Sequence, residues 1–494
     1  MKKLNERGGR MKRLRLMLLA MVLVLVLALC ASAFAVDVKF GGSYYAAGMY
    51  LDKTTLLKGG TPYIPSPGAS LPPVPVSTEN LSTAFYYQRL RVNMDFVVSP
   101  GLKFVTRFDA MKRAWGAARS VPGTATDDVS SGTRAENENI AFDWAYVDYT
   151  SPVGLFMVGI QDDGGWGTIF SDTSRPQGIV TYAIEAKGFV GALQIIKMLD
   201  GSKMAINNAQ YSDFDMDKYQ LVAMYEWKTG KAGLLGVYYR AANFRDMGML
   251  AKVFVLQPFV VTNVGPVKVQ AEVDYAWGNL KNDNPGGIEF RVDNLIGWID
   301  AGVDVKQYYF GGTFAYVAGN DWKNCDMTKG GVIKGGFLTG GMDWNPTLIL
   351  FNNERQYWAG DIGGHDMTGT FTNDVSKTFG LNDTGMYNTW FFQARAGVRP
   401  TDKLDINASV SYALADSKTL GSMLGPFIGM TATDAVSNEY GWEIDITGTY
   451  QITNNLSYML GGGYLFTGNY FKGSDPNNQL RDDFLILNKL TLTF

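Results

Sequence analysis

Hydrophobic and polar residues alternate with a period of two along most of the chain beyond residue 36. In the segment 267–277, one face carries Val267, Val269, Ala271, Val273, Tyr275 and Trp277, and the other carries Lys268, Gln270, Glu272 and Asp274. The segments 86–98, 102–110, 404–414 and 442–450 alternate in the same way. Because successive side chains of a strand point to opposite faces of a sheet, the pattern predicts β-strands with one apolar and one polar face.

The connections between these segments come in two sizes. Some are tight turns, at Ser99-Pro100-Gly101, Lys228-Thr229-Gly230, Asn263-Val264-Gly265-Pro266, Arg399-Pro400-Thr401-Asp402 and Thr453-Asn454-Asn455. Others are long, polar and rich in glycine or proline. Short turns at one end of the strands and long loops at the other are typical of outer-membrane barrels.

Strand length separates a membrane barrel from a soluble sandwich, which also alternates. Sandwich strands have about 5 to 6 residues, whereas membrane-spanning strands need about 9 to 11. The segments here have roughly 10 to 14 residues, in the range that the membrane requires. We therefore predict an all-β protein, a transmembrane antiparallel β-barrel with short periplasmic turns and long extracellular loops.

Pairing the segments across the turns gives the number of strands. Hairpins are expected near 84–115, 139–162, 177–200, 216–244, 250–279, 293–319, 387–415 and 438–468, with single strands at 38–51 and 482–494. This makes about 18 strands, within a range of 16 to 20, and places both termini on the periplasmic side. The stretch 320–386 is either one long loop or hides a further hairpin. A barrel of this width leaves an aqueous lumen.

The N-terminal 35 residues have the order of a secretory signal peptide. A basic stretch precedes an apolar run from Leu16 to Leu29, and small residues stand at Ala33 and Ala35. We expect cleavage after Ala35, with residues 36–494 forming a single barrel domain. Translation from Met11 would also leave a complete signal.

Composition narrows the classes of function. Removal of residues 1–35 leaves 37 basic and 46 acidic residues, a net charge of -9, so a nucleic-acid partner is not expected. Only Cys325 remains, which excludes an internal disulfide. No segment after the signal has 18 consecutive apolar residues, as a helical span would need. No His/Cys cluster for a metal and no cofactor motif is present.

The last strand carries a family resemblance. Leu490, Leu492 and the terminal Phe494 alternate with polar residues, which resembles the C-terminal signal by which outer-membrane barrels are recognised for assembly. The mature chain looks like a Gram-negative porin and, more loosely, is similar to the 18-stranded substrate-specific and alginate-export channels. The resemblance implies an integral outer-membrane protein, with lipids and the barrel-assembly machinery as partners and a homotrimer as one assembly.

The resemblance also points to a constriction loop. Porins carry a long loop after the fifth strand that folds into the lumen, and here that strand should end near residue 162. The candidate residues are Asp163, Trp166, Phe170, Asp172 and Arg175. The segment lacks the acidic and glycine motif of general porins, so an ordinary external loop is the alternative.

Charged residues on the polar faces are candidates for a selectivity filter, because charges at a constriction set ion selectivity. The basic candidates are Arg89, Arg91, Lys103 and Arg107, with Asp95 and Asp109 beside them, and the acidic candidates across the ring are Glu272, Asp274, Asp300 and Asp304. We hypothesise a transverse field between the two walls. Alternatively, these charges only keep the lumen hydrated and do not set ion selectivity.

These observations favour a porin for the passive diffusion of small hydrophilic solutes or ions. A substrate-specific or polysaccharide export channel is the alternative, although acids on the later strands speak against an acidic polymer. An outer-membrane barrel enzyme or structural scaffold is the competing class. We do not expect an enzyme, since nucleophilic catalysis commonly pairs serine with histidine and only His365 is available, in a loop-like region.

Overall fold

The computed structural model of the chain describes residues 36–58, 82–116, 140–163, 165–173, 175–201, 213–243, 245, 248–282, 287–325, 329–359, 385–420 and 432–494. The expected signal peptide and His365 lie outside these residues. Within them, eighteen strands form a closed antiparallel barrel, as predicted. The strands are β1 (Asp37–Leu51), β2 (Thr83–Ser99), β3 (Leu102–Ala114), β4 (Ala141–Ser151), β5 (Gly154–Asp162), β6 (Pro176–Ala186), β7 (Phe189–Leu199), β8 (Met216–Trp227), β9 (Gly230–Ala241), β10 (Met249–Val264), β11 (Val267–Asn282), β12 (Glu289–Val305), β13 (Tyr308–Val317), β15 (Thr389–Thr401), β16 (Leu404–Ala415), β19 (Glu439–Thr453), β20 (Leu456–Thr467) and β21 (Asp483–Thr493).

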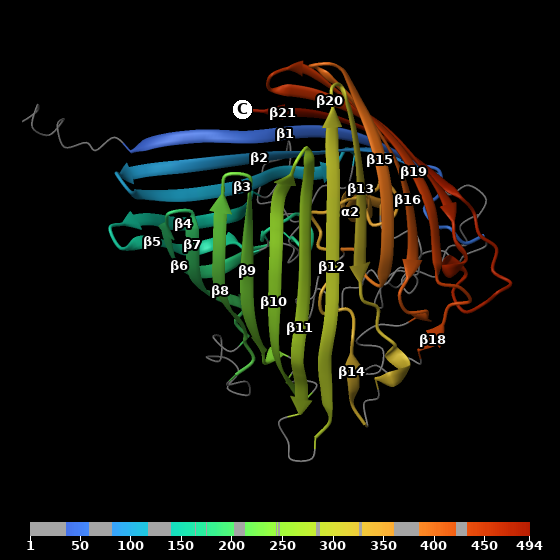
Figure 1. Cartoon of the computed structure of the whole chain (residues 1–494), viewed down its shortest axis with the longest axis horizontal. Helices are drawn as coiled ribbons and strands as arrows, with labels where there is room; N and C mark the ends of the chain where they lie inside the picture. The colour runs from blue at the N-terminus through green and yellow to red at the C-terminus, as the bar shows by residue number, and fades with distance from the viewer. Residues whose placement is uncertain are drawn as a thin grey trace, which may run out of the picture.

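The first and last strands close the ring. β1 pairs with β21 from Ser43↔Thr493 to Leu51↔Leu485, and Figure 1 shows the two strands side by side with the C-terminus next to β1. The backbone of Phe494 exchanges two hydrogen bonds with that of Gly42, with N···O distances of 2.8 and 3.1 Å. The closed ring leaves no strand without a neighbour on either side, so the strand backbones are hydrogen-bonded to one another within the sheet, as a bilayer demands.

Short turns join the strands at the end where the chain termini lie. Eight connections have two residues each, from 100–101 after β2 to 454–455 after β19. At the β6–β7 turn, Lys187 and Gly188 have φ values of 52° and 82°, the left-handed backbone that tight hairpins with a twist matching the strands require. The predicted alternation of tight turns and long connections is therefore confirmed.

The outer face of the barrel is apolar, as the alternation predicted. On β19, Trp442, Ile444, Ile446 and Tyr450 are exposed, whereas Glu443 and Asp445 on the opposite face are buried. Exposed aromatic rings gather across neighbouring strands, for example Phe254 of β10 stacked on Trp277 of β11 at 5.7 Å. An exterior of this kind faces lipid. No helix in the described ranges has the length and apolar character needed to span a membrane.

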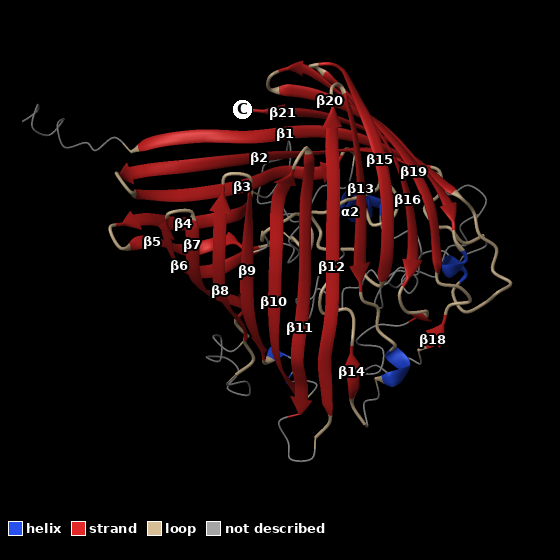
Figure 2. Cartoon of the chain, in the orientation of Figure 1, coloured by secondary structure: helices blue, strands red, loops and turns tan. Residues whose placement is uncertain are grey.

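The stretch 320–386 does not add a hairpin to the barrel, because β13 pairs directly with β15. Its described residues form one long β13–β15 loop. This loop holds the 3-10 helix η2 (Trp322–Asn324), the short strand β14 (Gly331–Ile333) and the helix α2 (Asn353–Ala359). Figure 2 draws the helices in blue and labels α2 among the red strands. The small hairpin β17 (Thr419–Leu420) and β18 (Thr433–Asp434) and the 3-10 helix η4 (Asn469–Lys472) belong to other long loops.

The β13–β15 loop extends the wall where neighbouring strands differ in length. β13 pairs with β12 only from Ile296 to Val305, so residues 289–295 of β12 rise beyond it. β14 pairs in parallel with Phe290, Arg291 and Val292 of this upper part. The loop thus covers what would otherwise be an unpaired strand edge.

Candidate functional site: the narrowed lumen

The described residues of the β5–β6 loop, 163, 165–173 and 175, reach across the interior to the wall formed by β10, β11 and β12. The indole Nε1 of Trp166 donates to the carbonyl of Gln257 on β10 at 2.9 Å. Both the backbone N and the Oγ1 of Thr168 donate to the carboxylate of Glu272 on β11, at 3.1 and 2.7 Å. Thus the candidate constriction loop lies against the inner face of the opposite strands.

An aromatic cluster packs this loop against the long loop. The buried ring of Phe170 lies parallel to that of Trp298 on β12, with a centroid distance of 6.0 Å. The ring of Trp344 from the β13–β15 loop lies in edge-to-face geometry with Phe170 and with Phe391 of β15, at centroid distances of 5.5 and 5.8 Å. The two loops therefore pack on each other inside the barrel.

A single carboxylate anchors the middle of the β13–β15 loop. Glu443 of β19 is fully buried and accepts hydrogen bonds from the backbone N–H groups of Leu348, Ile349 and Leu350, at 3.0, 2.6 and 2.7 Å. Three consecutive backbone amides converge on one carboxyl group, in the arrangement of a backbone nest.

The helix α2 is held against the inner wall a few strands further round the ring. Glu354 accepts from the ammonium group of Lys489 on β21 at 2.9 Å and from the hydroxyl of Tyr87 on β2 at 3.3 Å. The ring of Trp358 packs on that of Tyr87 at 4.6 Å. The described part of the β13–β15 loop thus contacts the inner wall at β19 and again at β21 and β2.

The basic candidates lie together on the inner face of β2 and β3, each close to an acid. Arg91 donates to both oxygens of Asp109, at 2.6 and 2.8 Å, and to Asp143 of β4 at 2.9 Å. Arg89 lies over the ring of Tyr45, 5.1 Å from its centroid, and 3.9 Å from Asp109.

The other two basic candidates also lie beside acidic side chains. Arg107 lies 3.1 Å from Asp143 and over the ring of Trp144, and Lys103 lies 3.4 Å from Asp95 and from Asp148. Acidic side chains on β2, β3 and β4 therefore neutralise much of the positive charge of the proposed basic wall.

The acidic candidates separate into two groups. Asp300 forms a two-point ion pair with Arg395 of β15, at 2.6 and 2.8 Å, and Asp304 lies 3.0 Å from both Lys268 and Arg399.

Glu272 and Asp274 are 1% and 0% exposed, beneath the β5–β6 loop. The transverse electric field between the basic and the acidic wall remains a prediction. The ion pairs described above are the charges that would produce it.

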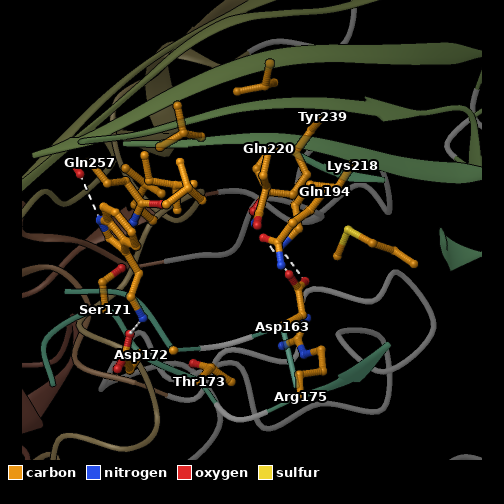
Figure 3. A pocket seen from close by; sticks show the side chains of 18 of the residues that line it. Asp163, Ser171, Asp172, Thr173, Arg175, Gln194, Lys218, Gln220, Tyr239 and Gln257 are labelled. Atoms are coloured by element: carbon orange, nitrogen blue, oxygen red, sulfur yellow. Dashed lines mark hydrogen bonds and ion pairs between the residues drawn. The ribbon is translucent and has the colours of Figure 1, made fainter. Parts of the chain in front are cut away.

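A cavity of about 370 Å³ lies between the β5–β6 loop and the inner wall of β5–β10. Its labelled residues in Figure 3 form two groups on either side of an open space, Asp163, Arg175, Gln194, Lys218, Gln220 and Tyr239 opposite Ser171, Asp172 and Gln257. The β13–β15 loop contributes Phe337, Leu338 and Thr339. The volume lies in the range, about 300 to 1,000 Å³, of small-molecule sites.

Two carboxylates of the β5–β6 loop have altered proton affinities. Burial is the main cause that raises the pKa of Asp172 to about 8, and nearby acids raise it further, although the Trp166 N–H opposes the shift. Burial also raises the pKa of Asp163, against the opposing effect of its ion-pair partner Lys218. The described residues contain no cluster of three or more potential metal-ligating side chains.

The anchoring residues that sequence reasoning missed are Glu443, Glu354 and Trp344. Glu443 looked like any polar residue on an alternating strand, since many strands carry acids on that face. One signal was available: the apolar run 348–351 is unusual for an external loop, and the structure buries Ile349 and Leu350.

Comparison with known proteins gives likenesses of fold only. No protein-family model and no curated protein matches the chain. OccK8 (OprE) of Pseudomonas aeruginosa is similar at 10% identity and a TM-score of 0.48, over 93% of this chain and 98% of that one. A BenF-like porin from Pseudomonas fluorescens is similar at 10% identity and a TM-score of 0.48, over 93% of this chain and 99% of that one. The outer-membrane channel DcaP of Acinetobacter baumannii is similar at 10% identity and a TM-score of 0.40, over 94% of this chain and 99% of that one. The fold itself is established by this chain's own strand pairing, as an 18-stranded antiparallel barrel with an apolar exterior.

Proposed function

We propose that the chain is an outer-membrane porin that lets small hydrophilic solutes diffuse passively through a narrowed aqueous channel. The observation that carries the proposal is the closed eighteen-stranded ring, apolar outside and polar inside, with two long loops folded into it. A barrel this wide leaves a water-filled lumen, and inward loops that bind the wall reduce its cross-section.

The folded-in loops favour a selective channel over a wide one. The β5–β6 loop and the β13–β15 loop are fastened by hydrogen bonds to Glu272 and Glu443 respectively, and an aromatic cluster joins them. A solute must therefore pass between these loops and the wall. We propose that Asp163, Trp166, Phe170, Asp172 and Arg175 form part of this constriction. A wide export path for a polymer fits this arrangement less well.

Ion conductance and solute permeation test the proposal. The purified full-length mature protein is inserted into planar bilayers and into liposomes. We expect discrete conductance steps and liposome swelling whose rate falls with solute size over the range of monosaccharides to trisaccharides. Conductance indistinguishable from that of protein-free bilayers, with folded barrel in the membrane, would overturn it.

The competing class, a barrel enzyme or scaffold, is addressed by the same preparation. We propose that the barrel has no catalytic role, and a lipase or esterase assay on the folded protein checks this. Outer-membrane lipids, the barrel-assembly machinery and a homotrimer belong to the proposal as expected partners. Chemical cross-linking in membranes distinguishes a trimer from a monomer.

A further inference from the structure

The wall side of the lumen cavity is built from aligned rows of side chains. Thr181 of β6 faces Gln194 of β7, and Gln194 faces Gln220 of β8. We call these three residues the amide row. Strand register places their side chains at one level, directly beside each other. The result is a short band of hydroxyl and amide groups along the inner wall.

The row on the periplasmic side of this band is mainly small and apolar. It consists of Ala183, Ala192, Val222, Leu235 and Gln257, which are successive cross-strand partners and all line the cavity. Alanine at two neighbouring positions leaves room in front of the wall. The indole of Trp166 lines the cavity from the loop side, fixed by its hydrogen bond to Gln257. A ligand here meets apolar surface beside polar groups.

The amide row keeps hydrogen-bonding capacity that the protein does not use. Gln194 donates through Nε2 to Thr181 at 3.1 Å, and Gln220 donates through Nε2 to Asp163 at 3.4 Å. Within the part of the chain that the structure describes, neither Oε1 atom accepts a hydrogen bond. Each amide has two donor hydrogens and an acceptor oxygen, so both side chains can still donate and accept.

The charges around the cavity compensate each other. The ammonium of Lys218 and the carboxylate of Asp163 form an ion pair in which both side chains are about 95% buried. An ionic ligand that recruited either group would leave the other charge buried without its partner, which is costly. Of the remaining charged lining residues, Asp172 is mainly neutral at pH 7, and Arg175 and Asp162 carry opposite charges. The lining therefore has no net charge for an ion to complement.

We infer that this cavity is a binding site for an uncharged polyhydroxylated solute of the size of a mono- or disaccharide, held by Gln194 and Gln220 against the apolar row. Such a molecule presents hydroxyls that both donate and accept, and C–H faces that suit alanine, leucine and indole surfaces. Its volume suits the cavity. The inference rests on the proposed channel function and names its substrate class.

Single-channel current recordings test the inference with three probes of equal size: glucose, its carboxylate analogue glucuronate and its amine analogue glucosamine. We expect glucose to interrupt the current saturably at lower concentration than either charged analogue. Glutamine-to-alanine substitution at both 194 and 220 should weaken the interruption by roughly 25-fold, about fivefold for each lost hydrogen bond. Gln270→Ala is the matched control, because this β11 glutamine is not part of the cavity lining.

The outcomes separate the inference from the proposed function. Absence of conductance overturns the channel itself and with it the site. A conducting channel that glucuronate or glucosamine blocks better than glucose, or whose glucose block survives the double substitution, overturns the inference alone. Heat-modifiable migration of each variant verifies that the barrel has folded.

Discussion

Replacing Glu443 by alanine should release the middle of the β13–β15 loop from the wall. The carboxylate accepts three backbone hydrogen bonds and is fully buried. With a net contribution of about 1 kcal/mol for each hydrogen bond, the loss is about 3 kcal/mol. That corresponds to about a 150-fold change in the equilibrium between the bound and released loop.

Glu443→Gln should have a smaller effect. Its remaining oxygen can keep the bonds from Leu348 and Ile349, which share one carboxylate oxygen, but the amide nitrogen then faces the N–H of Leu350. Glu289→Ala is the matched control. This exposed glutamate at the start of β12 accepts a hydrogen bond from Asn279, whereas the amides of residues 348–350 bond to Glu443 and not to it.

Hydrogen exchange measured by mass spectrometry reports the release directly. The amides of residues 348–350 should exchange about two orders of magnitude faster in Glu443→Ala and at the wild-type rate in Glu289→Ala, because exchange follows local opening. Single-channel conductance should rise or become noisier in the same variant. If these amides exchange no faster in Glu443→Ala, the carboxylate does not anchor the loop and the reasoning fails.

Three further outcomes follow from the contacts of the lumen and the terminal strand. Neutralising Arg89 and Arg91 with glutamine takes both guanidinium partners from Asp109, while Asp143 keeps Arg107, so reversal potentials in a KCl gradient should shift toward cation selectivity; an unchanged permeability ratio excludes this pair as the filter. The pKa of Asp172 is about 8 in the fold against an ordinary value of 3.8, so the packing of the β5–β6 loop should weaken as pH rises from about 4 to above 8; amide exchange of the loop across this range measures it, and Asp172→Asn should reduce the dependence, leaving the contribution of Asp163. Deletion of Phe494 removes its two backbone hydrogen bonds to Gly42 and should lower the yield of heat-modifiable barrel in the outer membrane, whereas an undiminished yield would show that the terminal residue is dispensable for assembly.

The sequence predicts the wall well because the wall is a local pattern. On β11, Val273, Tyr275 and Trp277 alternate with Glu272 and Asp274, and the structure places the two sets on opposite faces. Lipid on one side and a polar interior on the other impose a period of two on every strand. The two-residue turns punctuate this pattern, so the count of eighteen strands and the closing pair of β1 and β21 could be predicted from sequence alone.

The interior depends instead on contacts between residues that are far apart in the chain. Thr168 reaches Glu272, 104 residues away, and Leu348 reaches Glu443, 95 residues away. No local pattern distinguishes an acid that anchors a loop from one that lines water, since both stand at inward positions of a strand. The amide row, too, emerges only from the register of three neighbouring strands. The sequence by itself thus determined a closed barrel with a polar interior. Only the tertiary structure decided which loops enter that interior and which side chains they leave accessible, because that choice depends on long-range hydrogen bonds and burial rather than on the period of the chain.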